Sequence, residues 1–358
     1  MVGVVTGFSI GDRRVGDGAP CYIIAEAGVN HNGELDLALK LVAAAAGAGA
    51  DAVKFQTFSA ERLAADNAPK AAYQECSGAS GETQLQMLKR LELDEDEHCR
   101  IQESCKDRGI EFLSSPFDEE SADFLEELGI QAFKIPSGEL TNHRYLSHVA
   151  AKGLPLLVST GMADMMDVAA AVDAIERTGK NTDYGLLHCI SAYPAEASDC
   201  NLRAMTTLSE RFSVPVGWSD HTLGRDVAIA AAALGARMIE KHLTLDCTMT
   251  GPDHKASMEP VDFKDLVEGV RRTEEALGSG EKVPREAELE IASVARKSLV
   301  FRRDMEKGEA LRSGDVMAQR PGSGLPPSAL DEYLGRTLNG PVKSGEMLKA
   351  DMFGEVSS

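Results

Sequence analysis

The stretch YIIAEAGVNHNGELDLALKLVAAAAGAGADAVKFQ, residues 22–56, decides the fold class of this chain. It begins and ends with short apolar runs, at 22–27 and 52–56, and residues 35–48 between them have apolar side chains at the spacing of an amphipathic helix. Asp36 lies in the first turn of that expected helix, and Gly49 follows its last residue. The stretch therefore predicts a β-α-β unit with two parallel strands.

The same alternation of apolar runs and amphipathic segments continues to about residue 278. Further strands are expected at 111–115, 132–136, 156–160, 184–189, 214–219 and 237–242, and further helices at 121–128, 166–177, 226–234 and 261–277. Eight such units predict an α/β fold of the closed (β/α)8 type, the TIM barrel. An open doubly wound sheet is the alternative, but no G-x-G-x-x-G turn for a dinucleotide follows the first strand.

The pattern changes towards the end of the chain, and we expect three segments. The barrel occupies residues 1–279, a polar and charged linker residues 280–294, and a small, mostly β domain residues 295–358. A domain of this size is near the lower limit for independent folding, so we expect it to pack on the barrel or on another subunit. Residues 57–93 interrupt the barrel rhythm, and both a lid over the active face and a surface excursion fit this insertion.

Composition excludes some classes of function. The formal net charge of −20 over 358 residues argues against general binding to nucleic acid or to an anionic membrane, since both need a basic face. A small anionic substrate stays possible, because a few lysines in a pocket act locally. Seven cysteines without a C-x-x-C pair indicate reduced thiols in a cytoplasmic protein. We expect no signal peptide and no membrane span.

Two histidines end neighbouring expected strands. His221 closes the run VPVGWSDH and His242 closes ARMIEKH, with one helical segment between the two runs. Parallel strands bring their carboxyl ends to the same rim, so both imidazoles are expected there. Two neutral imidazoles that converge would bind a divalent metal and leave coordination positions for substrate oxygens. The alternative is that each histidine is a hydrogen-bonded core residue.

Lysines and hydroxyl groups occupy other strand ends of the same rim. Lys54 and Lys134 are expected inside the barrel mouth, where a desolvated ammonium needs an anionic partner. Short hydroxyl donors are expected nearby, at Ser137, Ser159 and Ser219. This combination suits a phosphate or a carboxylate ligand. The alternative is structural pairing of the lysines with rim glutamates, namely Glu26, Glu139 or Glu240.

Two of these glutamates are candidates for acid–base chemistry. Glu26 and Glu139 each lie at or just after an expected strand end. A buried carboxyl group has a raised pKa and can then exchange a proton near neutrality, whereas pairing with a lysine lowers the pKa. The sequence alone leaves open which effect is larger.

Beyond these single residues, motifs along the chain resemble the sialic acid synthase family, the N-acylneuraminate synthases often called NeuB. The motifs are IIAEAGVNHNGELDLALKL, GADAVKFQ, FKIPSGELTN, VSTGM, HCISAYP, GWSDHT, EKHLTLD and GPDHKAS, in family order. RKSLV and QRPGSG, near the end of the chain, resemble the SAF or antifreeze-like domain of that family. The resemblance implies a TIM barrel followed by a SAF domain.

The resemblance also implies a reaction. Such enzymes condense phosphoenolpyruvate with an N-acyl hexosamine, typically N-acetylmannosamine, to give a nine-carbon 2-keto sugar acid and phosphate. A divalent metal, Mn²⁺ or Mg²⁺, would be bound by the residues matching His221 and His242 and would polarise the open-chain aldehyde. Legionaminic and pseudaminic acid synthases and enzymes for 6-phosphorylated sugars share these motifs, so the acceptor stays open. A metal-dependent pyruvate aldolase and a non-catalytic sugar-binding protein also fit the residues at the strand ends.

The family pattern assigns two groups of ligand-binding residues. Phosphoenolpyruvate would be held by Lys54, Ser115, Lys134, Ser137, Ser159, Ser191 and Ser219. The sugar would contact Glu26, Gln56, Glu139, Tyr193 and Asp253. Ser115 stands where many members have Thr and keeps the hydroxyl. Ser191 stands where some members have Asn, so the acceptor stays open.

The family pattern also implies a partner. In the family, the SAF domain of one subunit caps the barrel of the other, and the arginine that matches Arg320 reaches the N-acyl group of the sugar. We therefore expect a domain-swapped homodimer whose sites are completed in trans, acting on small-molecule substrates.

Overall fold

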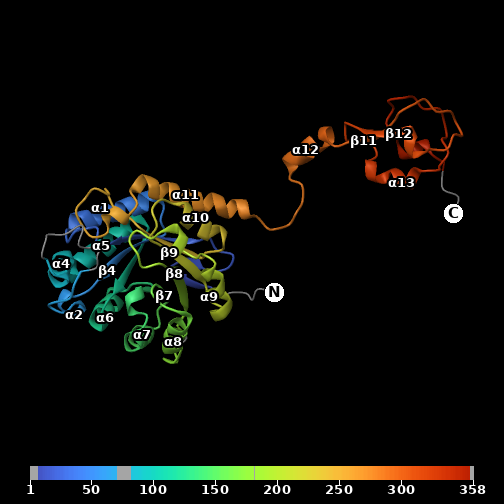
Figure 1. The fold of residues 1–358 in the computed structure, drawn as a ribbon. Helices are drawn as coiled ribbons and strands as arrows, with labels where there is room; N and C mark the ends of the chain where they lie inside the picture. Colours follow the sequence, from blue (N-terminus) through green and yellow to red (C-terminus); the bar gives the residue numbers. More distant parts are fainter. Residues whose placement is uncertain (1–6, 71–81, 181, 355–358) are drawn as a thin grey trace. The chain divides into compact units, whose positions relative to one another are not determined.

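The central element of the computed structural model is a sheet of eight parallel strands (Figure 1). The structure describes residues 7–70, 82–180 and 182–354. The strands are β3 (Tyr22–Gly28), β4 (Ala52–Thr57), β5 (Glu111–Pro116), β6 (Phe133–Ile135), β7 (Leu156–Ser159), β8 (Tyr184–Cys189), β9 (Val216–Asp220) and β10 (Met238–His242). Their order is β5-β4-β3-β10-β9-β8-β7-β6, and β5 also contacts β6, so the sheet is a nearly closed barrel. The predicted (β/α)8 fold is confirmed, and the open sheet is excluded.

Helices cover the outer face of the barrel. They are α1 (Leu35–Ala48), α5 (Glu95–Arg108), α6 (Glu119–Leu128), α7 (His143–Ala150), α8 (Met165–Glu176), α9 (Ala204–Phe212), α10 (Asp226–Ala233) and α11 (Pro260–Leu277). Local sequence sets their ends. The side chain of Asp94 caps α5 by accepting a hydrogen bond from the Glu97 N–H. Gly49 ends α1 in the left-handed conformation, at φ 83°, which a residue without Cβ adopts at low cost.

The two faces of the strands belong to different cores. Outward-facing side chains such as Ile23 and Phe55 pack against the helices in the main core. Inward-facing residues at the amino ends of the strands, such as Tyr22 and Met238, form a second core. The hairpin of β1 (Phe8–Ile10) and β2 (Arg13–Val15) adds Phe8, Ile10 and Val15 to this inner core. The amino end of the barrel is thereby filled with apolar side chains.

The chain divides into two compact units, Met1–Gly278 and Ser279–Ser358. The second unit contains α12 (Glu286–Ala295), the antiparallel strands β11 (Ser298–Phe301) and β12 (Val316–Gln319), and α13 (Leu330–Tyr333) around its own apolar core. Most of α12 lies in the segment expected to be a linker. That helix buries none of its residues, and the Glu288 side chain accepts a hydrogen bond from the Arg285 N–H at its start.

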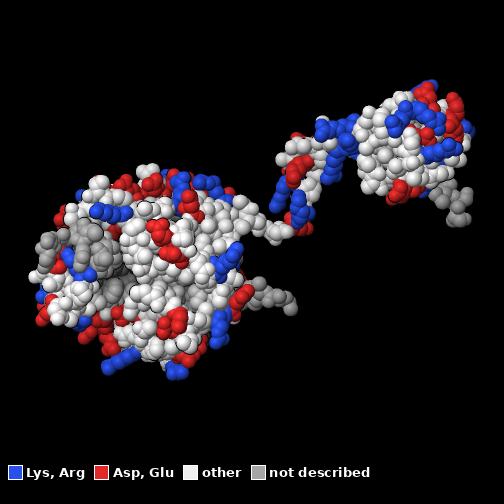
Figure 2. Space-filling view, viewed as in Figure 1, with Lys and Arg blue, Asp and Glu red and all other residues white. Residues whose placement is uncertain are grey.

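Charged side chains are spread over the surface. Figure 2 shows acidic residues distributed between basic ones on the visible face of the barrel unit. None of the helices among the described residues combines the length and apolar character that a bilayer crossing requires. The cysteines in the described part of the chain, which excludes Cys76, are free thiols.

Candidate active site

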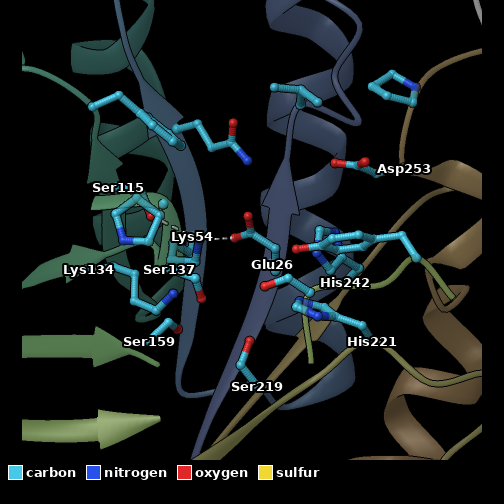
Figure 3. Close-up of a pocket in the computed structure, with 18 of the residues that line it drawn as sticks. Glu26, Lys54, Ser115, Lys134, Ser137, Ser159, Ser219, His221, His242 and Asp253 are labelled. Atoms are coloured by element: carbon cyan, nitrogen blue, oxygen red, sulfur yellow. Dashed lines mark hydrogen bonds and ion pairs between the residues drawn. The ribbon is translucent and has the colours of Figure 1, made fainter. Parts of the chain in front are cut away.

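A cavity of about 440 Å³ opens at the carboxyl ends of the barrel strands (Figure 3). Most of the residues predicted for the site line it: Glu26, Lys54, Gln56, Ser115, Lys134, Ser137, Ser159, Ser191, Tyr193, Ser219, His221, His242 and Asp253. In Figure 3 the lysines, Ser137 and Ser159 lie on one side of Glu26, and the histidines and Asp253 lie on the other. The cavity thus has a lysine–serine side and a histidine side, with a carboxyl group between them.

Glu139 is not among the barrel residues that line this cavity, and Arg320 belongs to the second unit of the chain. The β6 strand ends at Ile135, and the chain turns through a 3₁₀ helix at Ser137–Glu139, so the alternation of side chains stops there. Glu139 is half-buried and accepts a hydrogen bond from Asn142 Nδ2 at 2.8 Å. Arg320 belongs to the second unit, where it is exposed and its Nε donates to the Ala295 carbonyl at 2.9 Å.

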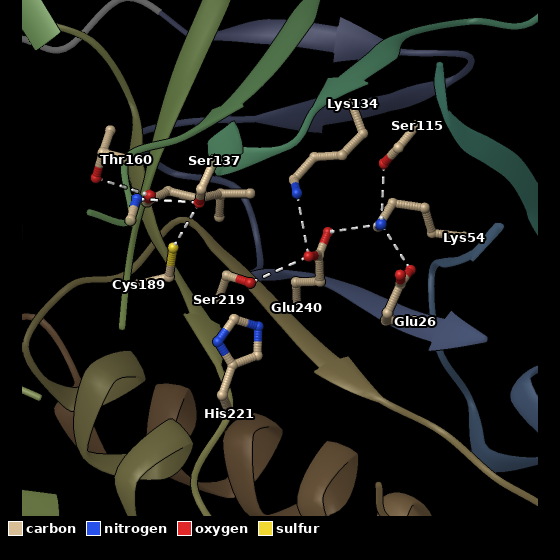
Figure 4. A network of polar contacts seen from close by, with 12 residues as sticks. Glu26, Lys54, Ser115, Lys134, Ser137, Thr160, Cys189, Ser219, His221 and Glu240 are labelled. Carbon is tan, nitrogen blue, oxygen red and sulfur yellow. Dashed lines mark hydrogen bonds and ion pairs between the residues drawn. The ribbon is translucent and has the colours of Figure 1, made fainter. Parts of the chain in front are cut away.

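Lysines and glutamates form a buried network on the cavity floor (Figure 4). Lys54 Nζ lies 2.7 Å from Glu26 Oε2 and 3.9 Å from Glu240 Oε2, and it donates to Ser115 Oγ at 3.1 Å. Lys134 Nζ donates to Glu240 Oε1 at 3.2 Å. The strand register explains the first contact, since Glu26 on β3 pairs with Lys54 on β4. The lysines therefore have structural partners within the same cavity in which a ligand would bind.

Glu240 is a cavity residue that the sequence predicted only as a structural partner. It lies on β10 two residues before His242, and alternation along a strand puts both side chains on the same face. Ser219 Oγ, its register partner on β9, donates to Glu240 Oε1 at 3.1 Å. The period of two in a strand was the signal that could have found it.

The two carboxyl groups of this network differ in pKa. Burial raises the pKa of Glu26 to about 7, although the adjacent Lys54 ammonium opposes the shift. Burial also favours a higher pKa for Glu240, but Lys134 and Lys54 outweigh it and lower that pKa to about 2. Glu26 can therefore exchange a proton near neutral pH, while Glu240 stays ionised. Such separation between neighbouring carboxyls is typical of acid–base sites.

The two histidines are buried and face each other across the rim. Their ring centroids are 5.5 Å apart, and the Tyr193 ring packs at 4.2 Å from His221 and 5.7 Å from His242. His221 Nδ1 donates to the Ile190 carbonyl at 2.6 Å, which leaves the lone pair on Nε2. Burial lowers the pKa of both rings, so both are neutral at physiological pH.

These rings fit the donor set of a divalent metal. Within the described residues, the buried His242 Nδ1 has no hydrogen-bond partner, and a neutral ring nitrogen is a good ligand. No group of three or more His, Cys, Asp or Glu side chains among the described residues is placed to bind a metal. The chain would thus supply two nitrogen ligands, and substrate or water oxygens would supply the others.

Hydroxyl and amide groups line the opposite side. In the described part of the chain the buried Ser159 Oγ has no hydrogen-bond partner. Ser137 Oγ accepts from the Gly161 N–H at 3.0 Å and lies 3.2 Å from Cys189 Sγ. A Cβ at Gly161 would overlap Ser191 Oγ, so only glycine allows this close approach. Together with Lys134, these groups could bind an oxyanion.

The insertion at 57–93 forms an apolar wall of the cavity; its residues 71–81 lie outside the described residues. Its helices α2 (Ala60–Leu63) and α4 (Gln84–Leu91) contribute Leu63, Met87, Leu88 and Leu91 to the lining. Met87, Leu88 and Leu91 pack with Val29 in a small separate core. The described part of the insertion therefore shapes the cavity rather than lying apart from it.

Comparisons with known proteins agree with this geometry. Residues 41–282 match the NeuB family, and residues 296–354 match the SAF domain. This chain belongs to the NeuB family. The resemblance inferred from the motifs is thus confirmed, and the second unit of this NeuB-family protein contains a SAF domain.

Several relatives of the chain are sugar-acid synthases. An N,N′-diacetyllegionaminic acid synthase from Legionella pneumophila is 49% identical to this NeuB-family chain and covers 94% of it, with 96% of the relative covered. The enzyme of that name from Campylobacter jejuni is 45% identical, over 91% of this chain and 98% of the relative. Human N-acetylneuraminate-9-phosphate synthase is 34% identical, over 95% of this chain and 94% of the human protein.

A solved structure of a sialic acid synthetase has a similar fold. The crystal structure of an N-acetylneuraminic acid (sialic acid) synthetase from Leptospira borgpetersenii, in complex with citrate, superposes with a TM-score of 0.71 at 33% identity. The match covers 80% of this NeuB-family chain and 95% of that chain.

Proposed function

We propose that the protein is a nonulosonic acid synthase. It condenses phosphoenolpyruvate with an N-acyl hexosamine and water to give a nine-carbon 2-keto sugar acid and phosphate. The observation that carries the proposal is the meeting, in one cavity, of two neutral imidazoles with a buried lysine–glutamate network. The first set suits a metal that activates a carbonyl group, and the second suits an anion.

The acceptor that we propose is a diacetamido hexose of the legionaminic type. Two relatives at 49% and 45% identity are N,N′-diacetyllegionaminic acid synthases, whereas the human synthase for a 9-phosphate product is 34% identical. N-acetylmannosamine is the second candidate, because the Leptospira sialic acid synthetase has the same fold at 33% identity.

In the proposed mechanism, Lys134 and the rim serines bind the carboxylate and phosphate of phosphoenolpyruvate. Lys54, held between Glu26 and Glu240, adds positive charge on the same side. His221 and His242 would hold Mn²⁺ or Mg²⁺, which supplies Lewis acidity to the aldehyde oxygen of the acceptor. The C2–C3 π electrons of phosphoenolpyruvate then form the bond from C3 to the aldehyde carbon as the carbonyl π bond breaks. The aldehyde oxygen gains a proton, and C2 is left as an oxocarbenium ion.

The second half of the reaction needs a base. Water adds at C2 and gives up a proton, and the C–O bond to phosphate breaks. Glu26 lies between the two sides of the cavity, and its pKa of about 7 suits this proton transfer. Glu240, which stays ionised, keeps the lysines in place and balances their charge.

The test is phosphate release from phosphoenolpyruvate and Mn²⁺ with a panel of acceptors. The panel contains N-acetylmannosamine, its 6-phosphate and a 2,4-diacetamido hexose. We expect phosphate release with phosphoenolpyruvate and none with pyruvate, and the highest kcat/KM with the diacetamido sugar. Turnover of pyruvate without phosphate would instead identify an aldolase, and saturable ligand binding without turnover would identify a binding protein.

A further inference from the structure

A buried ion pair lies directly behind the two cavity histidines. Lys241 Nζ on β10 is 2.7 Å from Asp220 Oδ2 on β9, and the two side chains are 2% and 0% exposed. Each residue immediately precedes a histidine, and the two are register partners across the parallel strands. The pair is therefore one strand position away from both imidazoles.

The pair occupies positions where the fold otherwise has apolar side chains. Strand side chains alternate between the two faces of a sheet, so Asp220 and Lys241 share a face with Trp218 and Ile239. Trp218 and Ile239 are also register partners, and both are fully buried in the core between the strands and the helices. The last register pair on the outward face of β9 and β10 is thus charged, and it lies next to His221 and His242, the candidate metal ligands.

Further hydrogen bonds join the pair to the backbone on both sides of His221. Lys241 Nζ also donates to the Thr222 carbonyl at 2.7 Å. Asp220 Oδ1 accepts from the Thr222 N–H at 3.0 Å and from Thr222 Oγ1 at 2.8 Å. The residue that precedes His242 therefore holds residues 220 and 222, between which His221 lies.

We propose that Lys241 and Asp220 are positioning residues that set the separation of the His221 and His242 rings for one divalent cation. A buried ion pair gives little net stability compared with apolar side chains of similar size, so stability alone does not account for charges at this rung. Residues that orient metal ligands typically change metal affinity by about 10- to 100-fold when they are replaced. The inference rests on the metal site in the proposed function.

The decisive measurement is Mn²⁺ binding to the full-length protein without substrates, followed by the EPR signal of free Mn²⁺. The double variant Lys241→Met/Asp220→Leu replaces the ion pair with apolar side chains. We expect it to stay folded and to bind Mn²⁺ about 10- to 100-fold more weakly than the wild type. We also expect the KM for phosphoenolpyruvate to change little, because the lysine–serine side is untouched. Wild-type Mn²⁺ affinity in the folded double variant would overturn the inference.

A second pair of variants decides the question if the double variant fails to fold. Asp220→Asn keeps one oxygen, which can take the place of Oδ1 and accept from Thr222, whereas Asp220→Ala removes both oxygens. We expect a loss of about 10- to 100-fold in Mn²⁺ affinity for Ala and a smaller loss for Asn, which keeps the contacts to Thr222 but not the ion pair with Lys241. Equal affinities in the two variants would contradict a positioning role.

Two controls separate this inference from the proposed function and from general destabilisation. His221→Ala should abolish saturable Mn²⁺ binding, and a wild type that binds no Mn²⁺ would contradict both the metal site and the positioning role. Arg271→Met breaks an ion pair with Asp51 (2.9 Å), which precedes β4 at the opposite end of the barrel. It should lower the unfolding temperature and leave Mn²⁺ affinity unchanged.

Discussion

At the scale of single residues, the most informative contrast is between Glu26 and Glu240. Both carboxyls are buried, and both lie within 4 Å of the Lys54 ammonium, at 2.7 and 3.9 Å. Their pKa values nevertheless move in opposite directions: burial, helped by the charge of Glu240, outweighs Lys54 at Glu26, whereas Lys134 and Lys54 together outweigh burial at Glu240. The balance between burial and the two ammonium groups therefore distinguishes the carboxyl that exchanges protons from the one that stays charged.

Replacement of Glu26 by Gln tests its role as a base. A base works in its ionised form, so phosphate release should rise with pH through the Glu26 pKa of about 7. Glu26→Gln should lower kcat by about 10²- to 10⁴-fold and remove that limb of the pH profile. The matched control is Glu176→Gln, at the end of α8 and not among the residues that line the cavity, which should keep the wild-type profile. A rate that falls as pH rises through 7 would make Glu26 an acid instead.

Lys134 is expected to serve phosphoenolpyruvate binding. A hydrogen bond to a charged group contributes roughly 1.5–3 kcal/mol, so Lys134→Met should lower kcat/KM for phosphoenolpyruvate by about 10- to 100-fold. Initial rates at varied phosphoenolpyruvate measure this effect, with circular dichroism to check the fold. Lys152→Met, which removes a lysine paired with Asp123 and Glu126, is the control and should keep wild-type kinetics. Equal losses in both variants would argue against a ligand contact.

At the scale of elements, helix α4 gives the cavity its apolar wall. We expect Met87→Ala to raise the KM for the acceptor sugar and to leave the KM for phosphoenolpyruvate nearly unchanged. The physical reason is that the lysine–serine side comes from other strands, while Met87 lines the cavity from the insertion. Leu85→Ala is the control, since Leu85 packs on the same small core without lining the cavity. A change confined to the KM for phosphoenolpyruvate would contradict this assignment.

The elements also show how far sequence alone could lead. The barrel was predictable because each strand is a short apolar run, and the helices between them follow a 3.6-residue period, as at 22–56. Cavity residues such as Lys54 and His221 followed from strand ends, where parallel strands converge, whereas Asp253 was expected only from the family resemblance. Glu139, at the end of the 3₁₀ turn that follows Ile135, does not line the cavity, although Ser137 at the start of that turn does. Helix α12 was missed because it buries none of its residues, although its Ala, Glu and Leu residues favour a helix.

At the scale of the whole molecule, the two units raise the question of how a complete site forms. We propose that Arg320 of one subunit completes the cavity of another in a homodimer. Subunits with Arg320→Ala and subunits with His221→Ala should each be inactive alone. An equal mixture that exchanges subunits should regain about a quarter of the wild-type activity, because on average one site in four combines an intact His221 with an intact Arg320. Phosphate release measures the recovery, and size-exclusion chromatography with light scattering confirms the dimers. Absence of recovery in confirmed heterodimers would place both residues in the same chain's site.

The β1–β2 hairpin at the amino end of the barrel has a consequence for the order in which ligands bind and leave. Phe8, Ile10 and Val15 close the amino end of the barrel. Within the described residues, the cavity therefore opens at the carboxyl ends of the strands. Whatever binds deepest must enter first and leave last. Because the lysines are deeply buried, we expect ordered binding in which the small anion binds before the sugar. Product-inhibition patterns would measure that order.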